Sequence, residues 1–432
     1  MNRVFVSLFV LFFLNSCSFN ENSSIWNKKN TSPANKKNIK EVLITKKIIA
    51  EEFNAELKLD LNKVKSNNKI TDLQNNYGSS SYQGLFEEKK NYNFSKIDNF
   101  KQLNLKPAFI NKDLIFFDKK GTVIRFDENQ KIVWKKNYYS KAEKKLKPKL
   151  LFAINKDQLI IADNIAKYFS INLKTGKLNW SKNSSYPFNS EIKIYKDKFF
   201  IVDYKNTLKC FNVSDGSQCW EVPTEVSFTI SNSKFSQIIS KDLIIFNNSI
   251  GDITAVNYKT GLLAWQLPTQ NNNIINETYS FKMSKLVSDR NSIFFSNNNN
   301  EFYSIDLKTG TINWTNDISS NLSPVIIDNF IFTVSNYGYL FVLQKNNGNI
   351  IRVNDLYKNY KKKNRNNITP VGFTIGNTNL YLSNNDGKMI VVDLITGQIL
   401  KIKKIARNTI SEPFIYNERL YVIKNGTIIS YD

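Results

Sequence analysis

The sequence predicts an all-β protein folded as an eight-bladed β-propeller. A turn pattern recurs along the chain, and the tryptophans that follow it are spaced 46, 40, 45 and 49 residues apart. The segments between the turns are short and rich in β-branched and aromatic residues, which favours strands. Repeats of this length form small sheets that cannot bury both faces alone, so they stack around a common axis.

The repeated turn has the form Asp/Asn-x-x-x-Gly, and a tryptophan follows the glycine by four residues. The stretch from Asp306 to Gly310 is a clear copy, and Trp314 follows it. Glycine suits such a hairpin turn because it adopts a positive φ without steric cost. Two later copies carry Arg352 and Lys401 instead of tryptophan. We expect the rings to pack between blades; a floor under a stacked cofactor is the alternative. The tryptophans in this register are Trp134, Trp180, Trp220, Trp265 and Trp314.

Each repeat is expected to open with a similar strand, which allows the blades to be counted. The last repeat contains residues 420–423 and 427–431 and would lack its outermost strand. A strand borrowed from upstream would complete that blade and remove an exposed sheet edge, and residues 92–96 are the candidate. The eight opening strands are predicted at residues 107–110, 149–152, 192–195, 235–238, 285–287, 324–327, 370–373 and 413–416.

The N-terminal part divides into two further segments. Residues 4–14 form an apolar run too short to span a bilayer, and it ends in Leu14-Asn15-Ser16-Cys17. This ending of residues 1–17 resembles the lipobox of bacterial lipoproteins, which implies cleavage of the signal peptide before Cys17 and diacylation of the Cys17 thiol. Ser18 then favours outer-membrane sorting; an ordinary secretory signal is the alternative. Residues 18–75 are predicted to be an Asn/Lys-rich tether with weak structure, and residues 76–432 the propeller.

Cys210 and Cys219 lie on opposite arms of the hairpin at Asp215-Gly216. An export compartment permits a disulfide, but cross-strand geometry strains one. A disulfide and two reduced thiols therefore both remain open.

The chain is strongly basic, with 60 Lys and Arg against 37 Asp and Glu. The lysines are spread over all repeats, and the two dense clusters, residues 141–147 and 358–365, are expected to be solvated loops. Contact with anionic lipid or an acidic partner is the alternative, and export argues against nucleic acid.

The sequence offers no catalytic or metal-binding set. It contains no histidine, which removes the Ser-His-Asp arrangement and most zinc sites. Asp118, Asp163 and Asp203 follow strands, but no spacing pairs them as acid and base. We therefore predict a non-enzymatic protein without metal or cofactor.

The pattern Asp-Leu-Lys-Thr-Gly-x-x-x-Trp resembles the pyrroloquinoline-quinone-type (PQQ-like) propeller repeat over residues 92–432. Within that superfamily, the lipobox, length and single-domain layout resemble the BamB-type lipoproteins of the outer-membrane β-barrel assembly machinery. The resemblance implies a scaffold on the periplasmic face of the outer membrane. It would dock through inter-blade loops onto the POTRA domains of the barrel-inserting subunit and meet unfolded outer-membrane proteins.

In that family an apolar loop after the third blade's tryptophan makes the docking contact. The matching stretch here is residues 226–231, so Phe228 and Ile230 are the implied partner-binding residues; plain loop packing is the alternative. The chain departs from the family pattern in two places. Ser231 stands where the family has arginine, and Ser280 and Lys282 fall near its acidic pair.

Two alternatives to this function remain. Quinone-dependent dehydrogenases share the repeat, but they need calcium ligands and a funnel over the cofactor, and many have an adjacent cysteine pair. This chain has no adjacent cysteines, and its insertions are short. An envelope lipoprotein with a different protein partner is the other alternative.

Overall fold

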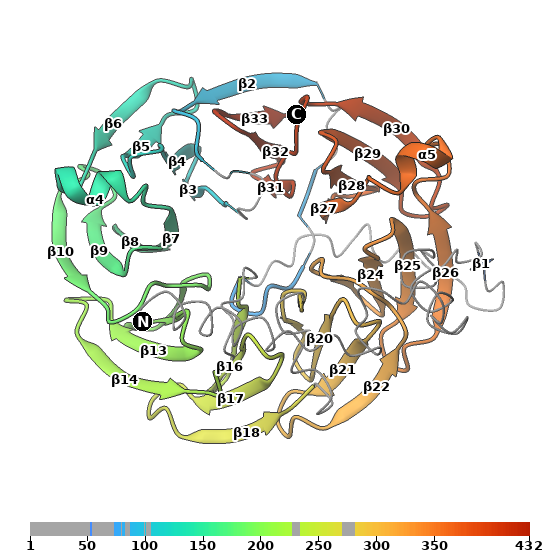
Figure 1. Ribbon diagram of the computed structural model, residues 1–432, viewed down its shortest axis with the longest axis horizontal. Helices are drawn as coiled ribbons and strands as arrows, with labels where there is room; N and C mark the ends of the chain where they lie inside the picture. The colour runs from blue at the N-terminus through green and yellow to red at the C-terminus, as the bar shows by residue number, and fades with distance from the viewer. Residues whose placement is uncertain are drawn as a thin grey trace, which may run out of the picture. The chain divides into compact units, whose positions relative to one another are not determined.

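A computed structural model describes residues 52–53, 73–78, 80–82, 87–98, 100, 105–226, 234–269 and 281–432. Among these residues the strands form eight antiparallel sheets, which surround a common axis as the blades of a propeller (Figure 1). The predicted fold and blade count are confirmed, and each predicted opening strand overlaps an inner strand.

Every blade runs from an inner strand near the axis to an outer strand at the rim. From inner to outer, blades 1 to 4 are β3 Ala108–Ile110, β4 Asp113–Phe117, β5 Val123–Phe126 and β6 Ile132–Lys136; β7 Leu150–Asn155, β8 Gln158–Asp163, β9 Lys167–Asn172 and β10 Leu178–Asn183; β11 Lys193–Tyr195, β12 Lys198–Val202, β13 Thr207–Asn212 and β14 Gln218–Pro223; and β15 Gln237–Ser240, β16 Leu243–Asn247, β17 Ile253–Asn257 and β18 Leu263–Leu267.

Blades 5 to 7 follow the same plan, and blade 8 takes its outer strand from the N-terminal side. They are β19 Val287–Ser288, β20 Ser292–Ser296, β21 Phe302–Asp306 and β22 Ile312–Asn316; β23 Val325–Ile327, β24 Phe330–Val334, β25 Tyr339–Gln344 and β26 Ile350–Asp355, with β1 Glu52–Phe53 added outside; β27 Pro370–Ile375, β28 Asn379–Asn384, β29 Lys388–Asp393 and β30 Ile399–Lys404; and β31 Phe414–Tyr416, β32 Arg419–Lys424, β33 Thr427–Tyr431 and β2 Glu88–Asn93.

Because the strands of a blade form an up-and-down meander, the propeller has two different faces. The turns between the first and second strands and between the third and fourth strands lie on one face, which we call the turn face. The crossovers from each outer strand to the next inner strand lie on the other, the crossover face. Two crossovers contain short helices, α4 Lys141–Lys145 and α5 Lys362–Arg365, within the two lysine clusters predicted as solvated loops.

The middle strands carry the core. Strand β8 is buried from Leu159 to Asp163, whereas all six residues of the outer strand β10 are exposed or only partly buried. Apolar clusters join neighbouring blades rather than filling single ones, and one runs from Ile428 of blade 8 through Phe116 of blade 1 to Phe169 of blade 2. The ring is therefore held together by burial between blades.

Five tryptophans bridge successive blades by the same contact. Each indole Nε1 donates to a backbone carbonyl in the turn before the outer strand of the next blade, over 3.0 to 3.2 Å. The acceptors for Trp134, Trp180, Trp220, Trp265 and Trp314 are Leu173, Val213, Lys259, Leu307 and Lys345. The indoles thus lie at blade interfaces near the rim, away from the axis.

The indole rings pack directly against the turn glycines of the next blade. Gly310 has φ +73°, and a Cβ there would lie 2.5 Å from Cε3 of Trp265. In two blades that lack the tryptophan, another side chain supplies the donor. The buried Arg352 donates to the carbonyls of Leu394 and Ile395, and Lys90 of β2 donates to that of Glu128. Burial lowers the pKa of Arg352 to about 10.

The closing strand is β2, so the borrowed strand is confirmed but its predicted bounds, residues 92–96, are wrong. Strand β2 pairs with β33 through Tyr92↔Ile428 and ends at Asn93. Tyr92 is 2% exposed and packs edge-on against Phe126 of blade 1. The chain then turns inward, because Phe94 packs on Phe116 at 4.8 Å between ring centroids. Phe94 therefore covers the core, and residues 94–96 do not extend the sheet.

Candidate docking surface

The two implied docking residues, Phe228 and Ile230, lie outside the described residues, as do Ser231, Ser280 and Cys17. The ends of the crossover that carries Phe228 and Ile230 are described. It leaves the outer strand of blade 3 after Pro223 and reaches blade 4 at Lys234, so its described ends lie on the crossover face. What the structure defines is therefore how this loop is anchored.

Asn206 anchors the first end. Its buried side-chain Nδ2 donates to the carbonyl of Glu225 at 2.7 Å and to the Ser249 hydroxyl at 2.8 Å. The Thr224 hydroxyl donates back to the Asn206 carbonyl at 2.9 Å. Val226, the last described residue before the gap, is 47% exposed. The loop thus starts from a fixed point with an apolar side chain already facing solvent.

Phe235 anchors the second end. It is 3% exposed, and its N–H donates to the Asn189 carbonyl of the preceding crossover at 2.9 Å. Ser190 pairs with Phe235 as a parallel bridge. The described ends of the loop, one after the outer strand of blade 3 and one before the inner strand of blade 4, are therefore both held by hydrogen bonds.

The turn of residues 248–252 in blade 4 ties this loop to the next crossover. Asn248 donates to the Thr224 hydroxyl at 3.3 Å, and the Thr269 hydroxyl donates to the Gly251 carbonyl at 2.7 Å. Thr269 is the last described residue before residues 270–280. Beyond that gap Lys282 is exposed, and its N–H donates to Asn298. The ends of both crossovers thus meet on one part of the crossover face, which we call the docking surface.

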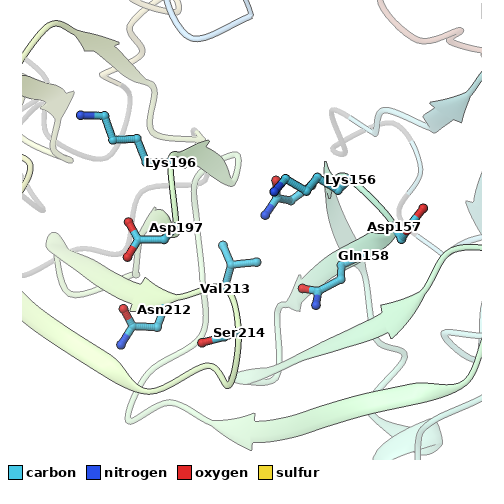
Figure 2. Close-up of a pocket in the computed structure, with 9 residues that line it drawn as sticks. Lys156, Asp157, Gln158, Lys196, Asp197, Asn212, Val213 and Ser214 are labelled. Atoms are coloured by element: carbon cyan, nitrogen blue, oxygen red, sulfur yellow. The ribbon is translucent and has the colours of Figure 1, made fainter.

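A pocket of about 670 Å³ lies on the turn face, between blades 2 and 3 (Figure 2). Eight of its nine lining residues have polar or charged side chains, and the ninth is valine: Asn155, Lys156, Asp157, Gln158, Lys196, Asp197, Asn212, Val213 and Ser214. The Lys196 ammonium already donates a hydrogen bond to the Tyr258 hydroxyl at 2.7 Å. The pocket is lined by side chains of turns, and none of these residues is a nucleophile next to a base. The lining residues therefore form no catalytic arrangement.

The three carboxylates singled out in the sequence shape turns on the crossover face. Asp118, Asp163 and Asp203 each accept two backbone N–H groups of the turn that follows. The Asp163 carboxylate also accepts the Tyr139 hydroxyl at 2.6 Å. Burial raises the pKa values of Asp163 and Asp203, and in both cases these hydrogen bonds oppose the rise. They are turn caps, one to a blade, and not an acid–base pair.

The structure has Cys210 and Cys219 as free thiols, and the disulfide between them stays a prediction. Cys210 is buried in β13, opposite Trp220, and burial raises the pKa of its thiol. Cys219 is partly buried, and its thiol lies 3.4 Å from the Asn212 side-chain oxygen.

The described part of the chain contains no group of three or more His, Cys, Asp or Glu residues that could hold a metal ion. Likewise, no helix among the described residues is long and apolar enough to cross a membrane.

The fold and the repeated contact between an indole and the next blade's turn define the class: an eight-bladed propeller of the PQQ-like repeat type. A family model described as outer membrane protein assembly factor BamB matches residues 119–354. This match covers more than half of the chain, and the chain therefore belongs to the BamB family.

A curated relative agrees with this assignment. An outer membrane protein assembly factor BamB from Shewanella oneidensis is 21% identical over 271 residues. The alignment covers 62% of this chain and 66% of that protein, slightly less than two thirds of the relative.

Among solved structures, BamB from Moraxella catarrhalis superposes with a TM-score of 0.64 at 16% identity, covering 81% of this chain and all of that one. A quinohemoprotein alcohol dehydrogenase from Comamonas testosteroni gives a TM-score of 0.62 at 10% identity, covering 87% of this chain and 82% of that one. At such identities these likenesses establish the fold alone.

Proposed function

We propose that this protein is a non-enzymatic scaffold lipoprotein of the outer-membrane β-barrel assembly machinery. Membership of the BamB family is the observation that carries the proposal. The capped carboxylates support a non-catalytic role, because each described candidate acid serves its own turn. In this proposal Cys17 is acylated, and the propeller is held at the outer membrane facing the periplasm.

The partner is the POTRA region of the barrel-inserting subunit, and unfolded outer-membrane proteins pass nearby. Phe228 and Ile230 provide the apolar contacts from the docking surface. The anchors at Asn206 and Phe235 support this assignment, since a loop fixed at both ends loses less conformational entropy on binding. Partly exposed Val226 extends the same apolar contact.

The test is affinity capture of the full lipidated chain from detergent-solubilised envelopes. The wild type is expected to recover the barrel-inserting subunit, and Phe228→Asp combined with Ile230→Asp is expected to reduce recovery at least about tenfold, since apolar anchors dominate such interfaces. The matched control is Leu262→Asp with Ile395→Asp, two residues 70% and 45% exposed in turns of the turn face.

The control variant should recover the subunit like the wild type. Far-UV circular dichroism of both double variants checks that the propeller is intact. Recovery of unrelated partners only, or equal loss in the two double variants, would refute docking through this surface.

A further inference from the structure

The outer strand of blade 1 and the crossover that follows it carry a dense run of lysines. This segment, residues 131–146, consists of β6, a short link and α4, and we call it the basic rim. Figure 1 shows both elements on the outside of the ring. The corresponding stretch of blade 5, residues 311–326, contains no lysine or arginine. The basic rim contains one acidic residue, Glu143, and six lysines: Lys131, Lys135, Lys136, Lys141, Lys144 and Lys145.

The one carboxylate of the basic rim is already neutralised by a lysine of the next blade. Glu143 forms an ion pair with Lys167 of β9 at 2.9 Å, and it accepts the Ser140 N–H at 2.6 Å in the capping box of α4. Burial alone would raise the pKa of Glu143, but the hydrogen bonds from Ser140 and Lys167 hold it below its ordinary value. The negative charge of Glu143 is therefore spent on fixing α4 to blade 2.

The helix directs its lysines away from this ion pair. Lys141, Lys144 and Lys145 stand at positions i, i+3 and i+4 and so share one face of α4, with Glu143 on the opposite face. No residue of α4 is buried. Because Glu143 is held against Lys167 of blade 2, the face with the three lysines is turned outward from the propeller.

The six lysines of the basic rim keep their charge uncompensated. Within the described part of the chain, none of their ammoniums forms an ion pair or a hydrogen bond. Asp98 does not supply a partner, because it is paired at 2.6 Å with Lys147, just beyond the basic rim. The basic rim is thus a local surplus of positive charge on the outside of the ring.

Apolar side chains are exposed among these lysines. Ile132 and Val133 of β6 are 54% and 47% exposed, and Leu146, at the end of α4, is 62% exposed. Strand β6 is the outermost strand of its sheet among the described residues. An exposed apolar residue at this position is not special by itself, since Ile312 is 51% exposed at the same position of blade 5. Blade 1 differs because its apolar side chains stand among uncompensated lysines.

We propose that the basic rim binds the surface of a bilayer that contains anionic phospholipids. Lysine ammoniums stay at the depth of the lipid phosphates, while their stems and the neighbouring apolar side chains reach toward the acyl chains. Clusters of about four to eight basic residues are attracted to anionic leaflets in this way.

A bilayer suits the basic rim better than an acidic protein does. Mobile headgroups can surround lysines on the convex outside of a ring, whereas a protein partner needs a matching concave surface. The exposed Ile132 and Leu146 also gain from contact with acyl chains, which an acidic protein surface does not offer. This site is separate from the scaffold proposal, because neither Cys17 nor the apolar docking residues take part in it.

The experiment measures sedimentation of the protein with lipid vesicles. It uses the chain from residue 18 onward, which contains every residue that the structure describes and cannot be acylated at Cys17. This chain should bind vesicles made of equal parts of phosphatidylcholine and phosphatidylglycerol, and not vesicles of phosphatidylcholine alone. Added salt should weaken the binding. Because the whole chain has a net charge of +23, variants are needed to locate the contact.

Lys135→Gln combined with Lys136→Gln should weaken vesicle binding about 25-fold, or about fivefold for each charge removed. The matched control is Lys259→Gln with Lys308→Gln, two exposed lysines at equivalent turn positions of blades 4 and 5. At moderate ionic strength charges more than about 10 Å apart are screened from one another, so the control should bind like the unsubstituted chain. Far-UV circular dichroism checks that both double variants are folded.

The apolar contribution has its own pair of variants. Ile132→Gln and Leu146→Gln should each weaken vesicle binding severalfold, because less apolar surface enters the interface. Ile312→Gln, at the position of Ile132 in blade 5, should leave the affinity unchanged. Bound vesicles should also slow the chemical acylation of Lys135, measured by mass spectrometry, and leave that of Lys308 unaltered.

Three results would overturn the proposal. The first is equal affinity for vesicles with and without phosphatidylglycerol, and the second is equal loss of binding in the two lysine double variants. The third is vesicle affinity unaffected by both Ile132→Gln and Leu146→Gln. In that case binding to soluble polyglutamate would identify an acidic protein as the partner of the basic rim.

Discussion

The contact between Gly310 and Trp265 provides a quantitative test of how the blades are joined. Gly310 has φ +73°, and an added Cβ would lie 2.5 and 2.7 Å from Cε3 and Cδ2 of the Trp265 ring. Gly310→Ala therefore adds two costs. The left-handed backbone costs an alanine about 1–2 kcal/mol, and overpacking against the ring costs about 1–3 kcal/mol. The expected loss of unfolding free energy is about 2–5 kcal/mol.

Gly426 offers a matched control with the backbone cost alone. Its φ is +97°, but the nearest atom to an added Cβ is Cγ of the flexible Lys96 side chain, 3.3 Å away. Gly426→Ala should therefore cost only about 1–2 kcal/mol. Trp265→Ala makes room for the new methyl group, so Gly310→Ala should also cost only about 1–2 kcal/mol in that background.

Reversible urea unfolding followed by far-UV circular dichroism measures all four terms of this double-mutant cycle. The expected coupling free energy between positions 265 and 310 is about 1–3 kcal/mol. Equal cost of Gly310→Ala with and without the Trp265 ring would refute the interlock between blades. A cost no greater than that of Gly426→Ala would refute it too.

Two further variants test the turn caps and the ring closure. Asp163→Asn should lower the unfolding free energy by less than about 1 kcal/mol at neutral pH, whereas Asp163→Ala should lower it by about 1–3 kcal/mol. The asparagine is expected to be tolerated because in blade 7 Asn384 accepts the Tyr357 hydroxyl at 2.8 Å, much as Asp163 accepts that of Tyr139. Burial raises the pKa of Asp163 in the folded state, so between the ordinary and the raised pKa the folded protein binds more protons than the unfolded chain. The carboxyl's contribution to stability therefore falls as pH rises through that window. Asp163→Asn should abolish this slope in urea titrations across pH, and an unchanged slope would contradict the assignment. Tyr92→Ala should lower the unfolding free energy by about 3–5 kcal/mol, because it leaves a cavity at the contact between blades 8 and 1. The control is Tyr186→Ala: Tyr186 is 45% exposed, and its loss should cost less than about 0.5 kcal/mol. Similar thermal shifts for these two variants would rule out the closing role of Tyr92.

Neither the anchors of the docking surface nor the cluster of Lys106, Glu191 and Lys285 could be read from the sequence. Lys106, Glu191, Lys234 and Lys285 each precede an inner strand, so a signal existed in their repeated position. Their convergence, however, depends on ring closure, which brings together residues from blades 1, 3, 4 and 5. Asn206 has no sequence signature that distinguishes an anchor from an ordinary turn residue. The roles of Phe228 and Ile230 remain predictions from the family resemblance.

The sequence by itself determined the features that depend on neighbouring residues. Strand positions and the blade count follow from local periodicity and from glycines that take a positive φ, as at Gly310. Tertiary structure decided the features that depend on burial between distant segments. Strand β2 ends at Asn93 because Tyr92 reaches the core beside Phe126 and Phe94 then turns inward onto Phe116. Similarly, Lys106, Glu191 and Lys285 are ordinary in the sequence, and their side chains meet only because the closed ring brings blades 1, 3 and 5 together at the axis.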